Sequence, residues 1–212
     1  MTTATHPRPT VSPIWPVPIY QADFPEAAAY NVALAELILL QQAAQEQPVI
    51  LPGGLDARKS SEDILTWEHP AVTWLRGHIM GAVTAMATDM LGDAAQHITA
   101  RPIAEGWAVT YAEGASLLPH THHSTSIAGV YYIDPGTTDS GQDPGFLQLL
   151  DPRPGAVARD SSSGVIRIQP VAGRMVAFPG WLNHQVRATA SKERLRICVA
   201  FNVSFTAPGG MA

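Results

Sequence analysis

The 212 residues are enough for one domain with a sizeable core, and a hydrophobic content of 46% with 15% charged residues argues against wholesale disorder. The net charge is −5 without any run of Lys or Arg, so nucleic acids and anionic membrane surfaces are poor candidate partners. No stretch approaches the roughly 18 consecutive apolar residues that a membrane span requires.

The first predicted elements are an N-terminal arm and a helix. Residues 1–14 are rich in Pro and Thr, so we expect a flexible arm without a secretory signal, followed by a single domain over residues 15–212. Residues 25–46 predict a helix, with Asp23 as its N-cap and Pro25 in its first turn. Its apolar residues predict a broad buried stripe made of Val32, Leu34, Leu37, Leu39 and Leu40.

A second helix is predicted from His69 to Leu91. Pro70 suits its first turn and Gly92 suits its C-cap. The stretch LPGGLDARKSS at residues 51–61, between the two helices, predicts a loop because it contains Pro and Gly, which commonly interrupt helices and strands. The helical part therefore covers about residues 15–95.

The remaining chain predicts a sheet. Short apolar runs alternate with Gly, Pro and Asp turns, giving strands at residues 103–112, 127–133, 145–150, 164–169, 174–178 and 194–205. Two helices followed by a succession of short strands argue against a doubly wound parallel sheet. We therefore predict a mainly β fold with N-terminal helices, in which two long helices buttress a jelly roll of the cupin-like kind over about residues 96–206.

The last predicted strand, RLRICVAFNV, has two different faces. One face is continuous and apolar, so we expect it to pack on the helices; it holds Leu195, Ile197, Val199, Phe201 and Val203. The other face is expected to point into the mouth of the sandwich; it holds Arg194, Arg196, Cys198, Ala200 and Asn202. A partly buried guanidinium needs an anion or a carboxylate partner, although an arginine on an edge strand can also reach solvent.

Three of the eight histidines crowd into the stretch LPHTHHS at the entry to a strand. Alternate strand residues point the same way, so His120 and His122 form a two-ligand half-site for a transition metal. An antiparallel neighbour could bring His184 opposite this pair. His123 is expected at the rim of the site or against the substrate. The other histidines are interpreted as structural or surface residues: His6, His69, His78 and His97.

The order of the motifs resembles a bacterial family of small 2-oxoglutarate- and iron(II)-dependent oxygenases. The pattern runs from H-x-H through G-V-Y-Y and D-P-R to F-P-x-x-x-x-H and R-I-x-x-x-F-N. It is carried by His120, His122, Gly129, Val130, Tyr131, Tyr132, Asp151, Pro152, Arg153, Phe178, Pro179, His184, Arg196, Phe201 and Asn202. The segment Ser61–Trp67 and the PVPIYQADFP opening extend the resemblance over nearly the whole chain.

The resemblance implies a distorted double-stranded β-helix with Fe(II) at its mouth. It implies that His120, His122 and His184 hold the iron, and that Arg196 binds the distal carboxylate of 2-oxoglutarate, with Arg194 on the same strand face as the fallback. The 2-oxo acid end of the co-substrate would chelate the iron, and O2 would take a remaining position. Oxidation of 2-oxoglutarate to succinate and CO2 would then accompany hydroxylation of a substrate C–H bond.

Two positions depart from the usual pattern of the superfamily. The usual iron triad has a carboxylate where this chain has His122, and three neutral imidazoles leave the full +2 charge at the metal. Glu113 and Asp134 are acids nearby in the sequence, but their spacing supports neither as a ligand. Cys198 stands where related sequences often have a serine beside the co-substrate carboxylate, and a thiol is a weaker hydrogen-bond donor.

Aromatic residues are expected in the wall of the pocket, because such walls suit buried small-molecule sites. The candidates are Trp107, Tyr111, Tyr132 and Trp181, and among them Tyr132 is also a candidate contact for the co-substrate. The alternative for each is an ordinary place in the core.

We expect a cytoplasmic enzyme with a small-molecule or amino-acid-like substrate. Cys198 is the only cysteine, so an internal disulfide is impossible and a reducing compartment is natural. A homodimer is expected only because twofold oligomers are common. Two other functions stay open, namely a three-histidine cupin-like dioxygenase that uses no 2-oxoglutarate, and a non-catalytic module that binds a metal or a small molecule.

Overall fold

The computed structural model of the chain describes most of the predicted domain. The described residues are 16–45, 49–51, 54–97, 99–136, 144–153, 164–190 and 194–206. The predicted arm, residues 1–14, lies outside them, and the single-domain assignment remains a prediction.

Both predicted helices are present. Helix α1 is Ala28–Ala44 and follows a 3-10 turn at Pro25–Ala27, and helix α2 is Pro70–Leu91. The His69 side chain caps α2, because its Nδ1 accepts the Ala71 backbone N–H at 3.1 Å. Gly92 ends α2 at a φ of 54°, which the sequence predicted through its glycine.

Asp23 is not the cap of the first helix, so that prediction is wrong. Its carboxylate instead accepts two hydrogen bonds from Arg174, at 2.6 and 2.7 Å. This pair joins strand β1 (Tyr20–Asp23) to strand β8 (Arg174–Pro179), where the two residues are directly opposite. A sequence pattern cannot show that a charge separated by 151 residues competes for the same carboxylate.

The buried stripe of α1 is narrower than predicted. Asn31, Leu34 and Ile38 face the protein interior, and Leu37 is half-buried. Three of the five predicted stripe residues are exposed instead, with exposed fractions of 60% for Val32, 41% for Leu39 and 70% for Leu40. The helix packs against α2 and β5 along one side, so the remaining apolar residues of a nearly uncharged sequence face outward.

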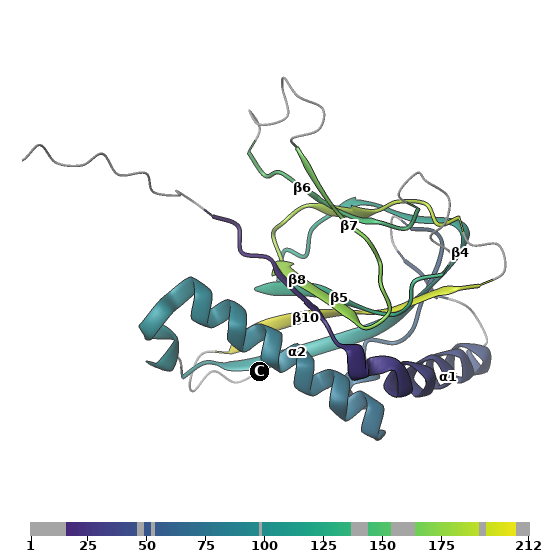
Figure 1. The fold of residues 1–212 in the computed structure, drawn as a ribbon, viewed down its shortest axis with the longest axis horizontal. Helices are drawn as coiled ribbons and strands as arrows, with labels where there is room; N and C mark the ends of the chain where they lie inside the picture. The colour runs from purple at the N-terminus through teal and green to yellow at the C-terminus, as the bar shows by residue number, and fades with distance from the viewer. Residues whose placement is uncertain are drawn as a thin grey trace, which may run out of the picture.

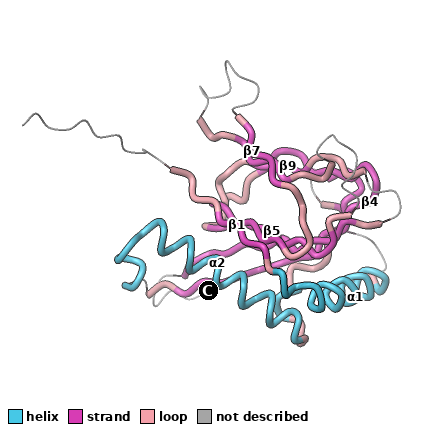
Figure 2. Tube along the Cα trace, viewed as in Figure 1, coloured by secondary structure: helices cyan, strands magenta, loops and turns pink. Residues whose placement is uncertain are grey.

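The strands form one strongly curled sheet, in the order β1-β8-β5-β10-β4-β9-β6-β7, and β3 pairs with β4 beside this path. All the paired strands are antiparallel. The strands not yet placed are β2 (Val49–Ile50), β3 (Gly54–Lys59), β4 (Arg101–His120), β5 (Ile127–Asp134), β6 (Leu147–Leu150), β7 (Val165–Ile168), β9 (His184–Val186) and β10 (Arg196–Thr206). The sheet curls into a half-barrel (Figures 1 and 2), which confirms the predicted fold class.

Six of these strands match the predicted runs, and four do not. β1, β2, β3 and β9 were not predicted, and the predicted loop at residues 51–61 is wrong where Gly54–Lys59 forms β3. These strands have two to six residues and include Gly and Asp, so their pattern carries little strand signal.

Strand β4 joins the two layers of the half-barrel. Its first half pairs with β10, from Arg101 opposite Thr206 to Tyr111 opposite Arg196. After Gly114, whose φ is 76°, its end pairs with β9. The strand therefore passes from the helix-covered layer into the opposite layer and ends at the mouth.

The two faces of β10 lie in different environments, as the alternation predicted. Ile197, Val199, Phe201 and Val203 are buried in a cluster with α1 and α2, which cover this side of the sheet in Figure 1. Cys198 lies in a second cluster inside the half-barrel. The first cluster also contains a polar link, since the Tyr131 hydroxyl donates to Asn31 Oδ1.

Leu195 departs from this pattern. It lies just before β10 with an exposed fraction of 41%, so it does not extend the apolar face. Among the described residues, no helix is both long and apolar enough to cross a membrane.

Replacing Gly129 by Ala should destabilise the protein. A Cβ at this position would lie 2.2 Å from Phe201 Cζ and 2.7 Å from the Val176 carbonyl oxygen. Because both neighbours belong to the packed sheet, we expect a loss of about 1–3 kcal/mol or more in the free energy of unfolding, measured by urea titration.

Gly77→Ala is the matched control. A Cβ at Gly77 meets nothing within 4 Å. The same added methyl group in the exposed middle of α2 should raise the stability by up to about 1 kcal/mol. Equal effects of the two substitutions would contradict the packing described for β5.

Candidate functional site

A cavity of about 300 Å³ lies inside the half-barrel. Its wall is mostly apolar, and no carboxylate is present among the described residues that line it. Polar groups gather at two places along it. Three imidazoles lie near the mouth, where β4 ends and β9 begins, and one guanidinium lies at the inner start of β10.

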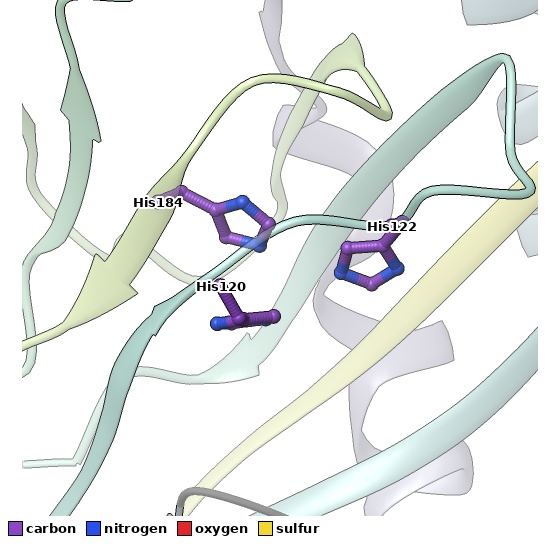
Figure 3. A group of neighbouring side chains, drawn as sticks. All are labelled: His120, His122 and His184. Carbon is purple, nitrogen blue, oxygen red and sulfur yellow. The ribbon is translucent and has the colours of Figure 1, made fainter.

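The three imidazoles come together from two strands and a turn (Figure 3). His120 is the last residue of β4 and is directly opposite His184, the first residue of β9; their ring centroids are 4.2 Å apart. His122 follows in the turn after β4, with its ring centroid 5.3 Å from that of His120 and 5.2 Å from that of His184. One nitrogen from each ring lies within 4.8 Å of the other two.

Two of these rings are held in a defined tautomer by the backbone. His120 Nδ1 lies 2.8 Å from the Leu118 carbonyl oxygen, and His184 Nδ1 lies 2.9 Å from the Leu182 carbonyl oxygen. A carbonyl oxygen only accepts, so in both rings Nδ1 carries the hydrogen and Nε2 keeps its lone pair. This is the tautomer that ligates a metal through Nε2, and such backbone support is typical of metal-binding histidines.

Burial favours the neutral form of two of the imidazoles, those of His184 and His122. Loss of hydration, together with the smaller effect of the neighbouring His120, lowers the pKa of His184 from 6.5 to about 3. Burial also lowers the pKa of His122. Neutral imidazole is the form that binds a transition metal, so the cluster fits such an ion held by nitrogen ligands.

The turn that carries His122 is fixed against the loop before β9. The His122 backbone N–H donates to the Gly180 carbonyl at 2.8 Å, and the Gly180 N–H donates back to the Ser126 carbonyl at 3.1 Å. A Cβ on Gly180 would lie 2.2 Å from the Thr125 carbonyl oxygen. The glycine after Phe178 and Pro179 therefore allows the two segments to approach closely.

The guanidinium of Arg196 is fully buried, with 1% of the residue exposed. It lies over the rings of Tyr111 and Tyr132, with its Cζ 4.6 and 5.2 Å from the two ring centroids. Its Nη1 donates to the Gly145 carbonyl at 2.7 Å, and its Nε has no hydrogen-bond partner among the described residues.

Neutral hydrogen-bond donors surround this charge. The Tyr132 hydroxyl is buried and also has no hydrogen-bond partner among the described residues. Burial raises the pKa of Tyr132 to about 12 and that of the Cys198 thiol to about 11, so both stay protonated at neutral pH. A buried cation with no acid near it among the described residues, beside a hydroxyl that has no partner among them, fits a carboxylate from a bound molecule.

The structure brings most of the predicted site residues into this cavity. His120, His122, His184, Arg196, Tyr132 and Cys198 all line it, and so do Trp107 and Tyr111.

Two of the predicted positions lie elsewhere, and a third, His123, is exposed beside His122, as a residue at the rim would be. Arg194 is exposed and forms an ion pair with Asp134, so it does not point into the mouth as predicted. Trp181 is 53% exposed and lines an outer groove instead of the cavity. His123 is exposed on the turn, where its ring contacts Thr121.

None of the remaining histidines and acids of the described ranges lines the cavity. Neither Glu113 nor Asp134 joins the imidazole cluster. His69 caps α2, and His78 packs against Phe24 and Trp74. His6 lies outside the described residues.

Backbone contacts were the part of the site that sequence reasoning missed. The carbonyls of Leu118 and Leu182 orient two histidines, and the carbonyl of Gly145 binds Arg196. Every residue has a main-chain carbonyl, so the residue types do not show which carbonyl will accept a hydrogen bond. Phe178, whose ring packs edge-on against His184 at 4.7 Å between centroids, was noted only as part of the motif.

Residues 105–202 match the sequence model of a family described as "Putative 2OG-Fe(II) oxygenase". A comparison with curated proteins found no match.

Solved structures share the fold. A prolyl-4-hydroxylase from Pseudomonas putida superposes with a TM-score of 0.60 at 17% identity, over 90% of this chain and 93% of that chain. A prolyl hydroxylase from Trichoplax adhaerens, in complex with a peptide of hypoxia inducible factor, gives 0.59 at 12% identity, over 87% and 82%.

A third similar structure is the epimerase SnoN in complex with Fe3+, α-ketoglutarate and nogalamycin RO. It gives a TM-score of 0.57 at 13% identity, over 92% of this chain and 87% of that chain. The family match, the half-barrel and the imidazole cluster agree with one another. Just under half of the chain, residues 105–202, therefore matches a family of 2-oxoglutarate- and Fe(II)-dependent oxygenases, the fold is shared with solved enzymes of this kind, and the three-imidazole cluster fits their Fe(II) cofactor.

Proposed function

We propose that the protein hydroxylates an unactivated C–H bond of a small, amino-acid-like molecule while 2-oxoglutarate is oxidised to succinate and CO2. The observation that carries this proposal is the presence, in one cavity, of a three-imidazole cluster and a buried guanidinium without an acidic partner among the described residues. Bound iron supplies the activation of O2 for the oxidation of the C–H bond.

In this proposal His120, His122 and His184 hold the iron. His122 takes the position that a carboxylate usually fills, so the three ligands are all neutral and the charge of +2 stays at the centre. The absence of acids from the described cavity wall supports this arrangement. Such a centre favours an anionic co-substrate.

Arg196 binds the distal carboxylate of 2-oxoglutarate in the same proposal. Tyr132 donates a second hydrogen bond to that carboxylate through its protonated hydroxyl. Cys198, two residues along the same strand face, contributes a small and weakly donating thiol. The apolar wall between the guanidinium and the imidazoles excludes water from the co-substrate chain.

The size of the cavity supports a small reacting group. A volume of about 300 Å³ is at the lower end for ligand pockets, and the co-substrate takes part of it. A cytoplasmic location also belongs to the proposal, because the single cysteine is buried as a free thiol. A homodimer remains a prediction.

Titration of 2-oxoglutarate into the anaerobic, Fe(II)-loaded protein should produce a visible charge-transfer band. Arg196→Met should abolish this band at ordinary co-substrate concentrations, because it removes the buried cation. Arg194→Ala is the control and should keep the band, since Arg194 is exposed and paired with Asp134. A band that survives in Arg196→Met but disappears in Arg194→Ala would show that the wrong arginine is assigned.

The same titration separates the proposal from the three-histidine dioxygenase that uses no 2-oxoglutarate. Iron bound by the imidazoles without any band would favour that alternative, and substrates that chelate the metal directly would be tested next. Consumption of O2 with release of succinate would exclude a non-catalytic binding module.

His184→Ala should reduce bound iron from one equivalent to a small fraction, as measured by metal analysis after desalting. Removal of one of three protein ligands leaves too few to hold the ion. His123→Ala should retain full stoichiometry because its side chain lies outside the cavity. His122→Asp should also bind iron, since it restores the commoner triad; loss of all metal there would count against position 122 as a ligand.

The stability of the metal-free protein should fall as the pH is lowered below 6.5. The unfolded His184 gains a proton near pH 6.5, whereas the folded one resists protonation until about pH 3. The unfolded state therefore binds more protons between these values, with a limiting slope of about 1.4 kcal/mol per pH unit for this residue. Urea unfolding of His184→Gln should show a shallower fall between pH 7 and 5; an identical slope would contradict the burial of a neutral imidazole.

A further inference from the structure

The third imidazole lacks the backbone support of the other two. His120 and His184 each place Nδ1 against the carbonyl two residues earlier, at 2.8 and 2.9 Å. For His122, no contact of this kind is formed with any carbonyl of the described chain. Its Nδ1 must find another acceptor if Nε2 is to keep a lone pair for the metal.

Asn202 has an acceptor to offer. It lies on β10, on the strand face that also carries Arg196, Cys198 and Ala200, and it is opposite Ala128 of β5. Its Oδ1 is buried and has no hydrogen-bond partner among the described residues. An orphaned buried acceptor costs stability, so its retention needs a reason.

The turn that carries His122 is attached to β10 immediately beside Asn202. The Ser126 N–H donates to the Val203 carbonyl at 3.0 Å, and the Ser204 hydroxyl donates to the Ser124 carbonyl at 3.2 Å. These two bonds place the turn over the residues that follow Asn202 in the strand.

The His122 ring is also placed near Asn202. It is stacked with Trp107 at 6.2 Å between centroids, and Trp107 lies opposite Ala200, two residues before Asn202.

We propose that Asn202 is the positioning residue of His122, with its Oδ1 accepting the Nδ1–H so that Nε2 faces the other two imidazoles. This inference rests on the proposed function in one respect, namely that His122 is a metal ligand. The proposed hydrogen bond does not require a metal, so it can be tested in the metal-free protein.

An amide suits this position better than an acid. A carboxylate that accepts from a ligating histidine makes the imidazole more basic and adds a negative charge beside the centre. Asn202 orients the ring and adds no charge, so the three-histidine centre keeps its full +2. The choice of an amide therefore agrees with a centre that binds an anionic co-substrate.

The first test is the tautomer of His122 in the metal-free protein, read by 15N NMR of histidine-labelled samples at pH 8. The wild-type ring should be the Nδ1–H tautomer. Asn202→Ala should shift it to a mixture or to the Nε2–H tautomer, and Asn202→Asp, which keeps an acceptor, should restore Nδ1–H. An unchanged His122 tautomer in Asn202→Ala overturns the inference, whatever the metal affinity.

Ser204→Ala is the matched control for this test. It removes a hydrogen bond between the same strand and the same turn without touching the acceptor. The Nδ1–H tautomer of His122 should persist in it. A shift as large as that in Asn202→Ala would assign the effect to the turn as a whole and would overturn a specific role for Asn202.

The second test is the dissociation constant for Co(II), measured by its visible absorption. Asn202→Ala should weaken binding about 10–100-fold, as changes to the partners of ligating histidines commonly do. The same substitution in a His122→Ala background should have no further effect, because the ring it orients is gone. A full additive loss there would overturn the inference.

These results also separate this inference from the proposed ligand set. If His122→Ala leaves Co(II) binding intact, the proposed role of His122 as a ligand fails. In that case the tautomer measurement still decides whether Asn202 orients the ring.

Discussion

The pairing of His120 with His184 is the interaction on which the site depends. It is the last pair of β4 with β9, and it exists only because the twenty-residue strand β4 passes from one layer to the other. The same strand pairs with β10 along its first half. One continuous backbone therefore sets both the distance between the layers and the position of the imidazoles relative to Arg196.

The electrostatics of the cavity follow from the absence of acidic side chains in its described wall. Three imidazoles lie near the mouth, one guanidinium lies at the inner end, and the described wall has no acid between them. A divalent ion at the imidazoles would place positive charge at both ends of an apolar chamber. A molecule with a carboxylate at each end and a short carbon chain is the natural complement, which is the chemistry of 2-oxoglutarate.

The sequence correctly predicted the parts of the molecule in which local spacing alone determines which way a side chain points. The alternation in β10 correctly separated Phe201 from Cys198, and Gly92 correctly marked the end of α2. The convergence of His120 and His184 also followed from spacing plus an antiparallel neighbour. Periodicity and special backbone angles are local properties, so a single sequence carries them.

The predictions from sequence were wrong where a partner far away in the sequence determines the position of a side chain. The local sequence around Asp23 predicts a helix cap, but Asp23 forms an ion pair with Arg174 instead. The alternation around Arg194 predicts a pocket residue, but Arg194 forms an ion pair with Asp134. The width of the buried apolar stripe on α1 depends on how much of the helix surface α2 and β5 cover, and they leave Leu40 exposed to solvent. β3 is held by pairing with β4 more than by its own residues.

The central place of β10 has a consequence for how the protein is made. The last strand of the described chain is hydrogen-bonded on one side to β4 and on the other to β5, so the middle of the sheet is filled last during synthesis. Until residue 206 leaves the ribosome, β4 and β5 present open edges, and the helices lack the part of their apolar partner surface that β10 supplies. The sheet therefore cannot close before β10 has been synthesised, and the open edges of β4 and β5 need protection until this strand inserts.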